Sequence, residues 1–228
     1  MKLIGSYLKQ LLFPNSCGRC RRDTIYALCE KCSGEILSTA SCLRCGSLLD
    51  QNSCNSCAQE LGTDRFRVIC DYADLRFWIA NCKREVGRKE LMMSPILMGE
   101  FYRNFLRNKD FSVDVQFVPS KFNSSRYDHM FTFKELSFNR VSLLLKKEVI
   151  PQKLLKREER IGQKRNLFEI VDNPLRISDT VLLIDDVLTT GASLGSCISL
   201  LLGLGYSKVF AIVFSYQTIC SGDGNGYR

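Results

Sequence analysis

The chain has 228 residues, of which 45% are apolar and 25% charged, values close to those of an average globular protein. No low-complexity tract precedes the glycine-rich tail at residues 221–228, and no run approaches the roughly 18 apolar residues that an integral membrane protein needs. The net charge of +8 favours contact with phosphate, nucleic acid or an anionic surface and carries no information about the fold. At this length we expect one medium-sized domain with a small appendage.

Residues 1–14 are predicted to form a short helix with apolar residues along one side, ending at Pro14. Lys9 interrupts the apolar pattern and no small-residue cleavage site follows, so the segment is a poor signal peptide. We expect the helix to dock on the core, because two lysines give too little positive charge for firm membrane attachment. The protein is therefore expected to be cytoplasmic, where cysteines bind metal more often than they form disulfides.

Eight of the twelve cysteines form four pairs with the same two-residue gap. The pairs are Cys17 with Cys20, Cys29 with Cys32, Cys42 with Cys45, and Cys54 with Cys57. Each pair predicts a knuckle, and two knuckles complete the tetrahedral four-sulfur shell that zinc accepts. Residues 15–62 are thus predicted to hold two structural zinc ions and to need them for folding. Sequential and interleaved pairing both remain open, as does the alternative of buried or redox-active thiols. Core positions are expected for Cys70, Cys82, Cys197 and Cys220.

Strands are predicted to alternate with helices over residues 65–220. The strands are expected at residues 66–72, 113–119, 149–155, 167–171, 181–184 and 208–214. The helices are expected twice within residues 73–107, once near residues 129–147, and at residues 194–204 with a stop at Gly205. This order predicts an α/β fold with a parallel sheet, which binds ligands beyond the carboxyl ends of its strands.

The most informative stretch is VLLIDDVLTTGAS at residues 181–193. Its apolar residues end at Asp185 and Asp186, and a Thr189-Thr190-Gly191 turn then leads into a helix. Small residues at the turn let the chain approach a ligand, and the N–H groups that open the helix point at it, so one phosphate fits there. The two carboxylates suit sugar hydroxyls or a hydrated divalent cation. The alternative is an ordinary buried strand followed by a capped helix.

Other chemistry finds little support in the sequence. The single histidine, His129, stands in a setting typical of a surface or helix-cap position. No Gly-x-Ser-x-Gly elbow, GxxxxGK[ST] loop or GxGxxG motif occurs, which argues against a hydrolase, a nucleoside triphosphatase and a dinucleotide-binding enzyme. Eight lysines and arginines between Lys146 and Arg165 predict either a solvated helix face or a nucleic-acid contact.

The segment IDDVLTTGAS resembles the phosphoribosyl pyrophosphate loop of type I phosphoribosyltransferases. Together with the cysteine knuckles, the strand-helix segment with Lys83, the Val118-Pro119 loop and the segment QKLLKREERIGQKRNLFEI, it resembles the ComF family of DNA-uptake proteins. The resemblance covers nearly the whole chain. It implies a type I phosphoribosyltransferase-like parallel sheet flanked by helices and preceded by a small cysteine-rich zinc-binding domain.

The resemblance also implies a set of site residues. Asp185 and Asp186 would hold the ribose hydroxyls or magnesium. The loop around the 5-phosphate would comprise Thr189, Thr190, Gly191, Ala192 and Ser193. The pyrophosphate side would comprise Lys83, Pro119, Ser120 and Arg126. Where relatives commonly read PVP followed by RGFNQ, this chain reads FVPS and then SSRYDHMFTF, so phosphate binding is better supported than turnover.

These features lead to the hypothesis of a cytoplasmic accessory factor for DNA uptake, as in competence and transformation, or for recombination. It would bind phosphoribosyl pyrophosphate with magnesium, or another sugar phosphate, as well as single-stranded DNA, and would meet a helicase or another DNA-uptake protein. One alternative is an active phosphoribosyltransferase that uses a base or amine and releases pyrophosphate. The other is a non-catalytic zinc-dependent interaction module whose sheet is a scaffold.

Overall fold

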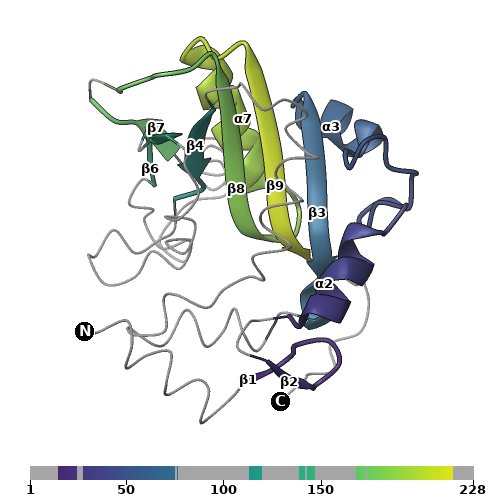
Figure 1. The fold of residues 1–228 in the computed structure, drawn as a ribbon. Helices are drawn as coiled ribbons and strands as arrows, with labels where there is room; N and C mark the ends of the chain where they lie inside the picture. The colour runs from purple at the N-terminus through teal and green to yellow at the C-terminus, as the bar shows by residue number, and fades with distance from the viewer. Residues whose placement is uncertain are drawn as a thin grey trace, which may run out of the picture.

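The fold is built around a five-stranded sheet in the order β3-β9-β8-β4-β5 (Figure 1). The computed structural model describes residues 15–24, 28–74, 76, 113–119, 139–141, 143–146, 168–172 and 174–217. The strands of the sheet are β3 (Arg65–Asp71), β4 (Asp114–Phe117), β5 (Asn139–Arg140), β8 (Thr180–Leu188) and β9 (Lys208–Tyr216). Every neighbouring pair is parallel, so the predicted α/β fold with a parallel sheet is confirmed.

The central strand β8 is buried on both faces. Its residues 181–184 are apolar and almost wholly inaccessible to solvent, as expected for a strand that has neighbours on both sides and cover above and below. The strand does not end at Asp185, because the nine-residue β9 beside it continues the ladder to Leu188. The sequence-based end of this strand at residue 184 is therefore wrong by four residues.

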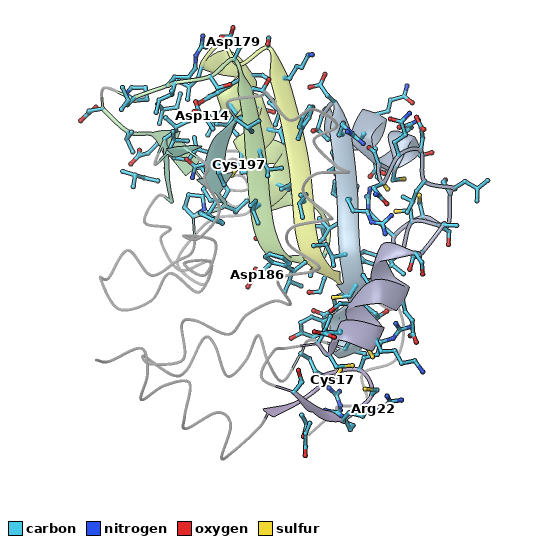
Figure 2. The ribbon with its side chains drawn as sticks, in the orientation of Figure 1. Cys17, Arg22, Asp114, Asp179, Asp186 and Cys197 are labelled. Carbon is cyan, nitrogen blue, oxygen red and sulfur yellow. The ribbon has the colours of Figure 1, made fainter. Side chains whose placement is uncertain are left out.

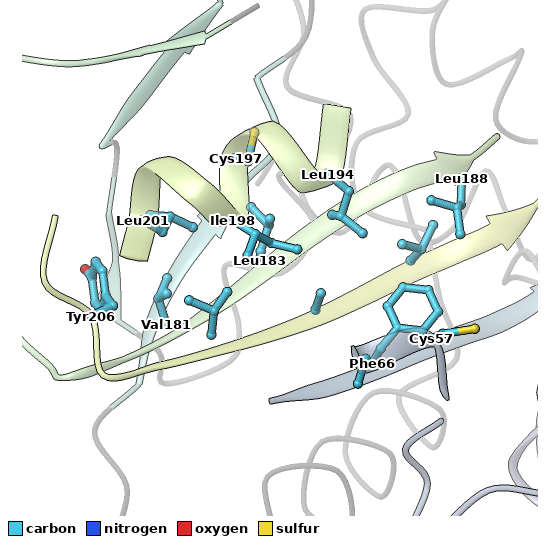
Figure 3. Packing of buried hydrophobic residues seen from close by; sticks show 14 of the residues in the cluster. Cys57, Phe66, Val181, Leu183, Leu188, Leu194, Cys197, Ile198, Leu201 and Tyr206 are labelled. Carbon is cyan, nitrogen blue, oxygen red and sulfur yellow. The ribbon is translucent and has the colours of Figure 1, made fainter. Parts of the chain in front are cut away.

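Helix α7 (Ala192–Gly203) covers one face of the sheet. Leu194, Ile198 and Leu201 recur at helical spacing and point toward Val181 and Leu183 of β8 (Figure 3). The helix stops as predicted, since Gly205 adopts a left-handed backbone with φ of 89° just beyond it.

The helix predicted near residues 129–147 is wrong for the part that the structure describes. There the chain forms β5 and then β6 (Leu144–Lys146), which pairs with β7 (Phe168–Ile170) as an antiparallel ribbon. This segment is hydrogen-bonded to the edge of β4 that does not face β8. Leu143 N–H donates to the Gln116 side chain (2.7 Å), and Val141 N–H donates to the Val115 carbonyl (3.0 Å). Val141, Leu143 and Leu144 are buried in this extended segment, whereas Leu145 is exposed. β7 and β9 confirm the strands predicted at these positions.

The cysteine-rich segment forms two short strands and two helices. These are β1 (Asn15–Ser16), β2 (Asp23–Thr24), α2 (Glu30–Leu37) and α3 (Asn55–Leu61). Both helices lie beside the edge strand β3, near its opposite ends (Figure 1). Cys17 and Ile36 join the hydrophobic cluster around Ile69, whereas Cys57 joins the cluster around Phe66 on the other face. The cysteine-rich segment thus contacts both faces of the sheet at its edge strand β3. The domain boundaries 15–62 and 65–220 stay predictions.

The amino edge of the sheet is fastened by the fully buried carboxylate of Asp114. Its Oδ2 accepts hydrogen bonds from the backbone N–H groups of Ile177 (3.0 Å) and Ser178 (3.1 Å) and from the Tyr206 hydroxyl (2.6 Å). The guanidinium of Arg176 lies over the Tyr206 ring, 5.3 Å from its centroid. These contacts fix the chain that enters β8 and the chain that enters β9.

Several predictions fall on residues that the structure does not describe. These are the helix at residues 1–14, the strand at residues 149–155, the tail at residues 221–228, and nearly all of the two helices within residues 73–107. Among the described residues, no helix combines the length and the apolar character needed to cross a membrane.

Candidate functional site

Two groups of four cysteines are each able to hold a metal ion. The first centre comprises Cys17, Cys20, Cys29 and Cys32, and the second centre comprises Cys42, Cys45, Cys54 and Cys57. Within each group the sulfur atoms all lie within 4.8 Å of one another. The knuckles therefore pair sequentially, first with second and third with fourth, which decides between the two arrangements that the spacing left open.

The sulfur geometry fits a tetrahedral metal. A four-sulfur zinc site with bonds of about 2.3 Å separates its sulfurs by about 3.8 Å. In the first centre, Cys20 and Cys29 are 3.6 Å apart between their Sγ atoms. The second centre has Sγ separations of 3.9 Å for Cys42 with Cys57 and 3.4 Å for Cys45 with Cys54. All eight thiols are free of disulfide bonds, so the two groups fit two structural zinc ions.

The two centres are built by one repeated unit. Each ligand of the second centre follows its counterpart in the first at a constant interval of 25 residues, as from Cys17 to Cys42. The first knuckle of each unit closes with the same turn, in which the N–H of Cys17 or Cys42 donates over 2.8 Å to the carbonyl five residues later. The second knuckle of each unit opens a helix, with Cys29 capping α2 and Cys54 capping α3. Each unit therefore places its first two cysteines in a tight turn and its last two at the start of a helix.

The repeat extends to an ion pair beside each centre. Arg19 in the first knuckle donates to Glu35 of α2 (3.1 Å), and Arg44 donates to Glu60 of α3 (2.7 Å) at the equivalent positions. In each unit the pair connects the turn to the helix, so side chains hold together the two knuckles that would share one metal ion. Both pairs have a partner exposed to solvent, so water screens them and each contributes little to stability.

The thiols within each centre have divergent pKa values. Burial raises the pKa of Cys17, but backbone N–H groups of Cys20, Cys29 and Arg19 outweigh it and bring the pKa to about 6, below the ordinary 9.0. For Cys32, burial and the neighbouring thiols raise the pKa well above 9.0. Four thiolates so close together repel one another, and a divalent cation is what allows all of them to ionise.

The second centre shows the same division. Burial raises the pKa of Cys45, but hydrogen bonding with Ser47 and with the thiols of Cys54 and Cys57 outweighs it and brings the pKa to about 6. Burial raises the pKa of Cys54 to about 11 and also raises that of Cys57. In each centre one thiol therefore has a lowered pKa and loses its proton most readily, whereas the thiols with raised pKa values would be helped to ionise by a bound cation.

A separate candidate ligand site lies at the carboxyl edge of the sheet. The chain leaves β4 toward β5 on one side and leaves β8 toward β9 on the other. Strands β4 and β8 are neighbours, and the strand that follows each of them in the chain lies on its other side, so the strand order reverses between them. In open parallel sheets this is the usual place for a ligand. Val118 N–H donates to the Ile184 carbonyl (2.9 Å), which brings Val118 and Pro119 alongside the acidic pair of β8.

Asp185 and Asp186 lie in the last part of β8, at this edge. Figure 2 shows Asp186 at the opposite end of the sheet from Asp114 and Asp179. Asp185 Oδ1 accepts the N–H of Asp186, and Asp186 Oδ1 accepts the N–H of Val187, both over 2.9 Å. These hydrogen bonds to neighbouring backbone N–H groups fix the orientation of both carboxyl groups, which are partly buried.

The loop at residues 189–193 joins this strand to α7. Gly191 caps the helix with φ of 82°, a conformation that strongly favours glycine. Thr190 Oγ1 accepts the N–H of Ala192 at 3.4 Å. The first N–H groups of a helix have no intrahelical partner, so this end of α7 is suited to an anion. The structure thus brings together the two aspartates, Thr189, Thr190, Gly191, Ala192, Ser193 and Pro119 at one edge.

The remaining predicted site residues, Lys83, Ser120 and Arg126, lie outside the described residues, as does His129. The constant interval between the two cysteine sets is a sequence signal for sequential pairing, although the spacing within the pairs left both arrangements open. The sequence carries no comparable signal for Arg67, whose side chain is buried.

Two comparisons with known proteins give no identification: no family model matches this chain, and neither does any curated protein.

Proposed function

We propose that this chain is a two-zinc protein of the ComF type whose phosphoribosyltransferase-like sheet binds a ribose 5-phosphate or phosphoribosyl pyrophosphate ligand. In this proposal it acts in the cytoplasm as an accessory factor for DNA uptake or recombination and binds single-stranded DNA. The zinc ions serve structure, since four thiolates leave no coordination position open for substrate.

The observation that carries the ligand proposal is the reversal of the strand order between β4 and β8, with the acidic pair and the α7 loop both at the carboxyl edge of β8. A phosphate at the start of α7 would receive backbone N–H groups, and the carboxylates of Asp185 and Asp186 would accept hydrogen bonds from ribose hydroxyls. Magnesium, when bound with a pyrophosphate group, would supply countercharge for it.

Thermal shift and calorimetry with a graded set of probes test this proposal. Ribose 5-phosphate should raise the melting temperature of the zinc-loaded protein, inorganic phosphate should raise it less, and ribose should leave it unchanged. In the variant with Asp185→Asn and Asp186→Asn, affinity for ribose 5-phosphate should fall about 10- to 100-fold, because hydrogen bonds to charged groups are lost. Affinity for inorganic phosphate should persist. Failure of all probes to bind the wild-type protein would reject the ligand proposal.

An assay of pyrophosphate release by the wild-type protein distinguishes ligand binding from catalytic turnover. Release of pyrophosphate from phosphoribosyl pyrophosphate in the presence of a base or amine, lost in the double aspartate variant, would replace an accessory role by a transferase activity. Binding without release supports the accessory role.

The DNA part of the proposal rests on the net charge of +8 and on the resemblance to DNA-uptake proteins. Zinc-loaded protein should retain a single-stranded oligonucleotide, with an affinity that falls steeply as salt rises from about 50 to 200 mM. If the protein does not bind the oligonucleotide even at low salt, the DNA part of the proposal is rejected, whereas the proposal of a ribose-phosphate site is unaffected.

A further inference from the structure

The edge strand β3 carries an unusual buried cation, Arg67. Its residue is 3% exposed, and in the part of the chain that the structure describes it is the sole buried basic side chain. Nη2 donates to the Ile36 carbonyl (3.3 Å), whereas Nε and Nη1 have no hydrogen-bond partner among the described residues. The guanidinium is thus enclosed with one long hydrogen bond.

Such a group needs a negative partner. Arginine keeps its charge throughout the pH range of folded proteins, and an uncompensated buried charge is strongly unfavourable. The Ile36 carbonyl lies in the last turn of α2, where the helix dipole is negative, but a partial charge compensates only part of a full one. The remaining compensation has to come from a group with a full negative charge.

The second centre, which lies beside β3, can supply such a charge. Burial lowers the pKa of the Arg67 guanidinium, and negative charge on Cys42 and Cys54 acts in the opposite direction. The backbone brings the two regions together, since Cys54 N–H donates over 2.8 Å to the carbonyl of Phe66, the residue before Arg67. Four neutral thiols would offer no charge, whereas a divalent metal with four thiolates carries a double negative charge.

The other arginine at this centre is already paired. Arg44 makes two hydrogen bonds to the carboxylate of Glu60, at 2.7 and 2.5 Å, and also acts on Cys57. Its charge is largely neutralised by that carboxylate. Of the basic residues that the structure describes, Arg67 is therefore the buried cation that could balance the metal cluster.

We propose that Arg67 is the buried counter-charge of the metal–thiolate cluster at the second centre and that it strengthens metal binding there. This inference rests on the two-metal part of the proposed function and is independent of the ribose-phosphate site. It also gives the second centre a dependence on one side chain outside its four ligands.

Stepwise removal of metal by a chromophoric chelator from the full zinc-loaded chain tests the proposal. With Arg67→Gln, one of the two ions should come off at a roughly 10- to 100-fold lower chelator concentration, the range for residues that support metal ligands. The other ion should be held as in the wild type. Arg67→Lys, which keeps a positive charge, should fall between the wild type and the glutamine variant. Arg65→Gln is the matched control, because Arg65 lies on the same strand and donates to the Gln51 carbonyl. It should retain both ions.

A substitution that changes the charge of the metal cluster distinguishes an electrostatic role of Arg67 from a packing role. Cys42→His keeps four ligands but lowers the negative charge of the cluster by one. The effect of Arg67→Gln on metal release should then shrink several-fold in the Cys42→His background. An equal effect in both backgrounds, or an equal effect of Arg65→Gln, would overturn the proposal.

The remaining outcomes are also decisive. If Arg67→Gln fails to fold in excess zinc while Arg67→Lys folds, the need for a positive charge at this position is supported. Loss of folding in both variants counts against an electrostatic role. If the wild type binds two ions and Arg67→Gln holds both as firmly, this inference alone fails. If the wild type binds no divalent metal, the two-zinc part of the proposed function fails with it.

Discussion

Leu61, the last residue of α3, packs against Gly191, the residue that caps α7: a Cβ on Gly191 would lie 3.2 Å from Leu61 Cδ2. Helix α3 starts directly after Cys54 and carries Cys57 in its first turn. The helix that completes the second centre therefore also supports the loop at residues 189–193. One leucine thus connects the second metal centre with the proposed ligand site.

Leu61→Ala should weaken ligand binding without removing metal. The half-buried side chain supports Gly191, so its loss should cost roughly 1–3 kcal/mol of stability and raise the Kd for ribose 5-phosphate several-fold. Thermal unfolding, calorimetry and metal content measure these effects. Leu48→Ala is the control, because that leucine of the same segment is 81% exposed. Similar weakening by both variants would show that the Leu61 contact has no special role.

Two glycine variants of the α7 region should change stability in opposite directions. Gly191→Ala places a Cβ at a φ of 82° and against Leu61, so it should lower the melting temperature and reduce affinity for ribose 5-phosphate at least about tenfold. Gly195→Ala places its Cβ in open space inside the helix and should stabilise by about 0.5–1 kcal/mol. Retention of full ligand affinity by Gly191→Ala would contradict a role for this loop.

Paired cysteine variants test the assignment of ligands. Cys17→Ser with Cys29→Ser removes ligands from the first centre alone, so one metal ion per chain should remain. Cys17→Ser with Cys42→Ser removes a ligand from both centres, so metal content should fall well below one ion per chain. Elemental analysis of the purified proteins measures the ratio. The reverse ranking would indicate interleaved knuckles.

Tyr206→Phe should destabilise the fold without affecting either site. The hydroxyl donates to the buried Asp114 carboxylate over 2.6 Å, and its removal should cost about 1–3 kcal/mol because a charged acceptor loses a partner. Denaturant unfolding measures the change, with metal content expected to stay at the wild-type ratio. Tyr216→Phe, at the far end of β9, serves as the control and should have a much smaller effect on stability.

Sequence patterns predicted the parts of the fold that are governed by local rules. The apolar run of β8, the glycine stop after α7 and the ligand type of both centres follow from periodicity, backbone conformation and thiol spacing. The knuckle pairing was within reach, since the interval from Cys17 to Cys42 recurs at every ligand.

Features that depend on distant contacts were beyond such rules. The chain near Leu143 is a strand because the Gln116 side chain and the open edge of β4 bind it, and neither is visible in the local sequence. Arg67 alternates with apolar residues in an ordinary strand pattern, and only the fold shows that its guanidinium is enclosed. The contact of Leu61 with Gly191 joins positions 130 residues apart.

The knuckle of the second centre also covers a surface that other chains could use. Strand β3 ends the sheet, and at Phe66 its outward N–H and carbonyl are bonded to Ser53 Oγ (3.1 Å) and to Cys54 N–H (2.8 Å). An exposed strand edge is a template for pairing between molecules. Loss of a metal ion from the second centre would free residues 53 and 54 and expose this edge of β3. Removal of zinc should therefore cause self-association of the protein before it causes unfolding.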